Sequence, residues 1–193
     1  NRNLTRLKLS SHFDTSFDDL FEEEPGETKL PPLKLHDLHL NGWEMTPTPS
    51  VLRHLECLHS LELPNLCTEL YSSIWHPLRS SSVHLRHISV YGINADFLDY
   101  MESYTGLEIL KISIAGLGFD ETDHLARRFY GKSLPTHKES IRTLQMGTVA
   151  EDEWTVGLKT VNVFDQYNML TCLAVGLKAT DINPGKGIEG DIV

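Results

Sequence analysis

One short phrase occurs seven times along this chain of 193 residues: an apolar residue, any two residues, an apolar residue, any one residue, and a third apolar residue. The seven copies begin at Leu4, Leu35, Leu58, Leu85, Leu107, Ile141 and Leu170. On a helix, offsets of 0, 3 and 5 residues point to about 0°, 300° and 140°, which gives no common apolar face. On a strand, the second and third apolar residues point to the same side. Each copy of the phrase therefore predicts a short strand.

Repetition at this scale predicts an α/β leucine-rich-repeat solenoid of about seven irregular repeats, with a curved parallel sheet inside and helices and loops on its convex side. The copies start 31, 23, 27, 22, 34 and 29 residues apart, so two repeats exceed the usual period of about 20–29 residues. Ordinary repeats carry Asn or Cys three residues after the last apolar position. This chain has other residues there: His12, Trp43, Leu66, Ile93, Ala115, Val149 and Lys178. Backbone groups in its turns must find other partners.

Helical segments are expected between most strands. Asn94 is a suitable cap for a helix over 95–103, and Thr122 for a helix over 123–130. Residues 50–57 and 68–78 are shorter candidates. Because strands and helices alternate, the sheet should be parallel.

The composition suits a single domain over residues 1–193 that binds protein rather than nucleic acid. The formal net charge is −10, whereas nucleic-acid binding depends on neutralising phosphates, so a protein partner with basic patches fits better. No apolar run reaches the roughly 18 residues that cross a membrane. The three cysteines have no metal-binding spacing, and we expect them to be reduced, buried thiols of an intracellular protein, cytoplasmic or nuclear.

The residues between the apolar positions should form three columns on the concave face, beginning at Thr5, Arg6 and Lys8. Charge and imidazole concentrate on the middle strands, and the last strand is nearly bland. The predicted partner-binding patch is His36, Asp37, His39, His59, Glu62, Arg86, His87, Glu108, Lys111 and Arg142. The alternative is that these are ordinary solvated side chains.

Several histidines near acids invite a metal hypothesis. Structural sites need three or four converging ligands, and a flat sheet spreads side chains apart, so no metal and no cofactor are expected. Binding that depends on pH is an alternative use of the imidazoles. No nucleophile elbow, phosphate loop or zinc-protease motif occurs, and nothing brings Asp120, His124 and Ser133 together as a triad. We therefore expect no enzyme, while a site in residues 10–34 or 113–140 is the enzymatic alternative.

The stretch from residue 85 to 146 resembles the leucine-rich-repeat regions of fungal F-box-like proteins, especially those of mushroom-forming fungi. Four segments carry the likeness: 85–93, 107–112, 124–130 and 134–144. The most distinctive part is Arg128-Phe-Tyr followed by Leu134-Pro-x-His-x-x-Ser140.

This resemblance implies the substrate receptor of a cullin–RING ubiquitin ligase. An N-terminal F-box would bind the ligase adaptor, and the repeats would hold the protein to be ubiquitylated. Residues 1–30 do not match an F-box, so we expect this chain to be a fragment that lacks its F-box and its C-terminal cap. The alternative is a free-standing leucine-rich-repeat scaffold or receptor fragment with no role in ubiquitin ligation.

Overall fold

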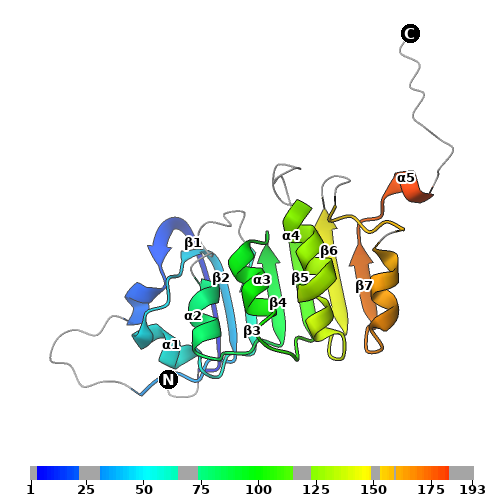
Figure 1. Cartoon of the computed structure of the whole chain (residues 1–193). Helices are drawn as coiled ribbons and strands as arrows, with labels where there is room; N and C mark the ends of the chain where they lie inside the picture. The colour runs from blue at the N-terminus through cyan, green and yellow to red at the C-terminus, as the bar shows by residue number, and fades with distance from the viewer. Residues whose placement is uncertain are drawn as a thin grey trace, which may run out of the picture.

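A computed structural model describes residues 4–21, 31–64, 74–114, 123–148, 153–158 and 160–182. Seven strands form one all-parallel sheet in chain order, β1-β2-β3-β4-β5-β6-β7 (Figure 1). Their bounds are β1 Arg6–Ser16, β2 Asp37–Glu44, β3 Ser60–Leu63, β4 His87–Tyr91, β5 Ile109–Ile114, β6 Thr143–Thr148 and β7 Cys172–Val175. Every strand contains the second and third apolar residues of one copy of the phrase, and the first apolar residue lies just before the strand. The parallel α/β prediction is confirmed.

The register places the middle apolar residue of each copy beside that of the next. Seven residues are consecutive partners across the sheet: Leu7, Leu38, Leu61, Ile88, Leu110, Leu144 and Leu173. We call this row the central ladder. The copy of the phrase that begins at Leu35 lies as predicted, because Leu38 and Leu40 are both buried.

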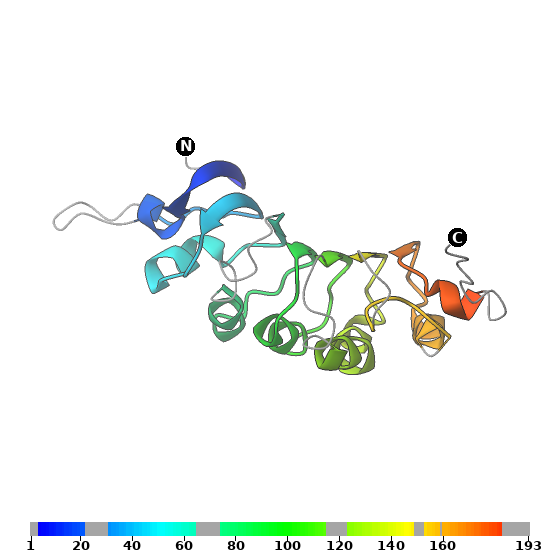
Figure 2. The same cartoon turned by 90° about the horizontal axis from the view of Figure 1, so that it is seen from above.

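Helical segments alternate with the strands. They are η1 Asp18–Phe21, α1 Pro49–Leu55, α2 Trp75–Ser80, α3 Ala95–Met101, α4 Asp123–Arg128, the π-helix η3 Phe129–Ser133, η4 Pro135–His137, η5 Val161–Gln166 and α5 Ala179–Ile182. Seen from above, the strands follow a shallow arc and the helices between them lie along its outer side (Figure 2). The Asn94 cap is confirmed, since its side chain accepts a 2.8 Å hydrogen bond from the Phe97 N–H. Thr122 and residues 68–73 lie outside the described residues.

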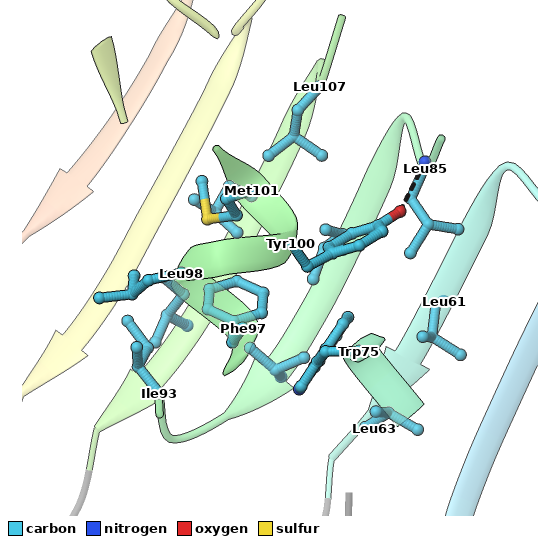
Figure 3. Close-up of a cluster of buried hydrophobic side chains, with 14 of the residues drawn as sticks. Leu61, Leu63, Trp75, Leu85, Ile93, Phe97, Leu98, Tyr100, Met101 and Leu107 are labelled. Carbon is cyan, nitrogen blue, oxygen red and sulfur yellow. Dashed lines mark hydrogen bonds between the residues drawn. The ribbon is translucent and has the colours of Figure 1, made fainter. Parts of the chain in front are cut away.

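The core lies between the sheet and this helical layer. Figure 3 shows α3 directing Phe97 and Met101 toward the strands, next to Trp75 of α2. The rings of Trp75 and Phe97 meet edge to face, with centroids 4.8 Å apart. From the second to the sixth copy of the phrase, every apolar position is buried. The apolar positions of the phrase are therefore the residues that face the helical layer.

Burial fails at the two ends of the ladder. The repeat phrase predicts that all seven middle apolar residues are buried. Leu7 is only half-buried and Leu173 is 44% exposed, so the prediction is wrong for Leu173. The reason is that β7 is an edge strand with a neighbour on one side only. Leu158 and Leu177 are also exposed at this end, at 69% and 56%.

Side chains of the helical layer, rather than Asn or Cys in the turns, satisfy backbone groups at the entry to β4. The Tyr100 hydroxyl accepts from the Leu85 N–H at 3.1 Å (Figure 3). It also donates to the Val83 carbonyl at 2.8 Å. The Tyr104 hydroxyl donates to the Leu85 carbonyl at 3.0 Å. Burial raises the pKa of both phenols, which stay neutral donors.

The same arrangement recurs before β5. The Leu107 N–H donates to Nδ1 of His137 at 3.3 Å, and Ser140 Oγ donates to the Leu107 carbonyl at 2.8 Å. With its Nδ1 accepting, His137 donates from Nε2 to the Met101 carbonyl at 3.0 Å. Burial lowers the pKa of His137 to about 4, which keeps the ring neutral in this role. Before β2, the Leu33 N–H likewise donates to Nδ1 of His54 at 2.8 Å.

The first strand is longer than the phrase predicts. β1 pairs regularly with β2 up to Ser10, loses register, and pairs again from Thr15. Gly42, opposite this irregularity, has φ of +72°, and a Cβ there would collide with the Ser11 carbonyl oxygen. Only glycine allows so close an approach with that backbone conformation.

The composition led to two further predictions, that the cysteines are buried and that no segment crosses a membrane. Cys57 is half-buried, but Cys172 is exposed on the edge strand, so the prediction of buried thiols was wrong for Cys172; Cys67 lies outside the described residues. In the described part of the chain, no helix is long and apolar enough to span a bilayer.

The ladder predicts unequal costs for one substitution made at two rungs. Leu110→Ala, in a fully buried position, should lower the free energy of unfolding by about 2–5 kcal/mol. Leu173→Ala should lower it by less than about 1 kcal/mol, because that side chain is partly solvated already. Urea unfolding followed by circular dichroism measures both. Equal losses would contradict the positions assigned to these two leucines.

Candidate functional site: the open face of the sheet

The face of the sheet opposite the helices is the candidate site. Figure 2 shows the helices that connect the strands on the other side of the sheet. Two of the three predicted columns follow directly from the register. One runs through Arg6, Asp37, Ser60, His87, Ile109, Thr143 and Cys172. The other runs through Lys8, His39, Glu62, Ser89, Lys111, Gln145 and Ala174.

The third column precedes the strands and is aligned by backbone hydrogen bonds. The His36 carbonyl accepts from the N–H of His59, whose carbonyl accepts from Arg86, and the series continues through Glu108 and Arg142. The ten predicted patch residues are thus laterally adjacent across one surface. The structure brings them together as the sequence predicts, without testing whether they bind a partner.

Each carboxylate of the patch has a cationic or imidazole partner on a neighbouring strand or strand entry. Asp37 accepts from Arg6 Nε at 3.2 Å. Glu108 lies 3.5 Å from Arg86 Nη1. Glu62 lies 2.8 Å from Nδ1 of His39. These groups are partly solvated, so the pairs organise the surface more than they stabilise the fold.

The centre of the patch is electrostatically coupled. The hydrogen bond with His39 is the main cause that holds the pKa of Glu62 below its ordinary value, and the charges of His87 and Lys111 act in the same direction. Partial burial opposes them. Glu62 is therefore ionised at neutral pH and accepts a hydrogen bond from His39 Nδ1–H.

His87 is a half-buried imidazole at this centre. Burial lowers its pKa, and nearby Lys111 lowers it further, while Glu62 and Asp37 oppose the shift. Its Nδ1 is hydrogen-bonded to Ser60 Oγ at 3.2 Å, and its Nε2 is buried with no hydrogen-bond partner among the described residues. The ring is therefore neutral at pH 7.

The remaining predicted residues are two histidines in ring contact and two cations without an ion-pair partner. His36 and His59 are exposed and meet edge to face, with ring centroids 5.2 Å apart. Lys111 and Arg142 form no ion pair with any described carboxylate. Positive charge is therefore available at the β5–β6 part of the face.

Two shallow hollows lie on the face. One, of about 340 Å³, lies over β1–β4 and is lined by Arg6, Lys8, Asp37, His39, Glu62 and His87 among others. The second, of about 540 Å³, lies over β4–β7 and has Lys111 as its only charged lining residue, with Ser89, Gln145 and Thr148 nearby. Open hollows of this kind suit an extended partner segment better than an enclosed small molecule.

The predicted patch omitted two residues that the structure places in it. Arg6 pairs with Asp37, and Lys8 lines the first hollow. Both stand in the predicted columns, so their column position was a sufficient signal. The patch was drawn around the middle strands and for that reason excluded β1.

The metal-site and catalytic-triad hypotheses gain no support from the described residues. Within the described ranges, no three His, Cys, Asp or Glu side chains gather as metal ligands. Ser133 is buried and donates to Glu102 at 2.8 Å, while His124 is exposed and Asp120 lies outside the described residues. Of the two members that the structure describes, Ser133 has Glu102 rather than His124 as its hydrogen-bond partner.

The coupling at the centre of the patch predicts that two substitutions shift the pKa of His87 in opposite directions. Glu62→Gln should lower the pKa of His87, because a charge that favours the imidazolium is removed. Lys111→Gln should raise it, because a repelling charge is removed. An NMR titration of the imidazole protons measures both. A His87 pKa that responds to neither change would show that these three side chains do not share a site.

Comparison with known proteins adds no relative: no family model, no curated protein and no solved structure matches this chain.

Proposed function

We propose that the chain is an irregular leucine-rich-repeat solenoid whose open sheet face binds a protein. We propose further that it serves as the substrate-recognition arm of an F-box-type receptor of a cullin–RING ubiquitin ligase. The repeat phrase and the parallel sheet support the first part, and the resemblance around residues 85–146 supports the second.

The observation that carries the binding proposal is the contrast between the two faces of the sheet. The helical side buries a continuous apolar core, whereas the open side carries charged and imidazole side chains in aligned columns. Solenoids commonly bind partners on such an extended face. The two hollows of this face are open and shallow, which also favours a macromolecular partner.

The segments that resemble fungal F-box-like proteins have structural roles in this chain. Arg128 donates from Nε to Glu102 of the preceding helical segment at 2.8 Å. The Tyr130 hydroxyl donates to the Trp154 carbonyl at 2.7 Å, and His137 and Ser140 bond to the strand entry at Leu107. In this chain these residues therefore fix helical segments to one another and to the sheet. The ligase role rests on this likeness alone, while the binding role has the open face as a separate support.

A charge-reversed triple variant, Glu62→Lys, Arg86→Glu and Lys111→Glu, tests the binding role. It should weaken capture of the native partner at least about tenfold, because it inverts the pattern of charge across three adjacent strands. The measurement is affinity purification of the full-length protein from its own cells, with quantification of what accompanies it.

The matched control is Glu139→Lys, Arg127→Glu and Lys138→Glu, which makes the same charge changes at exposed residues of α4 and of the turn after η4, outside the predicted patch. It should bind normally. Undiminished capture by the first variant, with an unchanged circular dichroism spectrum, would remove the open face as the binding site. Ligase adaptor and cullin in the purified material support the receptor role, and their absence beside a retained partner would favour a free-standing scaffold.

A further inference from the structure

The open face has a charge opposite to that of the molecule as a whole. The chain has a formal net charge of −10. Its three open-face columns carry five cations, Arg6, Lys8, Arg86, Lys111 and Arg142, against three carboxylates, Asp37, Glu62 and Glu108. The face is thus a cationic region on an acidic protein. The composition alone suggested a partner with basic patches, and the distribution of charge points the other way.

The ion pairs of the open face leave more cations than carboxylates without a partner. All three carboxylates are already engaged, Asp37 with Arg6, Glu62 with His39 and Glu108 with Arg86. Three cations are left over: Lys8, Lys111 and Arg142 have no carboxylate within ion-pair distance in the part of the chain that the structure describes. Lys8 and Arg142 are exposed, and Lys111 is half-buried at the edge of a hollow. Unpaired cations beside occupied carboxylates favour an incoming anion.

We propose, building on the binding role above, that the open face recognises an extended acidic segment of a protein, with Asp or Glu side chains meeting Lys8 at one end and Lys111 with Arg142 at the other. Each end lies in a hollow or beside it, since Lys8 lines the first and Lys111 the second. The three interleaved carboxylates and the net acidity of the chain disfavour a polyphosphate backbone.

The register gives the spacing of the acidic side chains. Lys8 and Lys111 occupy the same column and are separated by four strand steps, through His39, Glu62 and Ser89. Four steps of about 4.8 Å make about 19 Å, which an extended segment covers in about five or six residues. Glu62 lies midway and is ionised, so the segment should be uncharged or basic at its centre. The recognition pattern is therefore two acidic positions about five or six residues apart with no acid between them.

Selection from a random peptide library tests this without knowing the partner. The probe is a phage-displayed library of about 12 randomised residues, long enough to span both hollows. Selected peptides should be enriched in Asp and Glu relative to the input library, with paired acids about five or six residues apart. Their dissociation constants, measured by fluorescence anisotropy, should rise at least about tenfold in the variant Lys8→Gln, Lys111→Gln and Arg142→Gln.

The control variant Arg79→Gln, Arg127→Gln and Lys138→Gln removes the same charge from exposed residues of the helical side and should bind the peptides normally. Selected peptides rich in apolar or basic residues, or no peptide above background, would overturn the acidic-segment inference. If such peptides still lose binding in the charge-reversed triple variant, the open face remains a protein-binding site and only its specificity is wrong. Tighter binding of a fluorescein-labelled single-stranded oligonucleotide than of any selected peptide would also overturn the inference.

Discussion

Lateral alignment of the central ladder is the constraint on which the rest of this structure depends. Parallel strands in a common register place Leu38, Leu61, Ile88, Leu110 and Leu144 side by side, and all five are buried against the helical layer. A slip of one residue on any strand would turn its apolar side chain to solvent and its polar neighbour into the core. The same alignment forces the intervening residues into columns on the opposite face. The core and the candidate binding surface are thus two consequences of one register.

The helical layer contributes more than apolar contact. Tyr100, Tyr104 and His137 reach backbone groups at strand entries that would otherwise lack partners in a buried environment. On the same side, Glu102 joins neighbouring helical segments, since it accepts hydrogen bonds from Arg128 at 2.8 Å and from Ser133 at 2.8 Å. These contacts, chiefly the one with Arg128, lower the pKa of Glu102 to about 2, so it remains ionised across the physiological range. Polar groups of the outer side therefore fix helices to strands, and polar groups of the open face are left for other roles.

The strands, their order and the columns could be predicted because a two-residue period is written directly in the sequence. The Asn94 cap was also predictable from the local sequence, since a cap depends on residues only three positions apart. Contacts between distant segments were not predictable: no local pattern links Tyr100 to Leu85 or His137 to Leu107. Exposure of Leu173 was missed because the phrase is identical in a central and an edge strand, although their surroundings differ. The patch was found by type of residue, and the cations left without a carboxylate partner could be identified only once the ion pairs were known.

The most direct test of the account is the distance between the two ends of one column. With Cys57, Cys67 and Cys172 replaced by serine, spin labels at Lys8→Cys and Ala174→Cys can be measured by double electron–electron resonance. Six strand steps of about 4.8 Å predict a single distance distribution centred near about 29 Å, slightly modified by curvature and label length. A distribution centred below about 20 Å would place β1 and β7 close together. That result would contradict strands stacked in chain order across one open sheet.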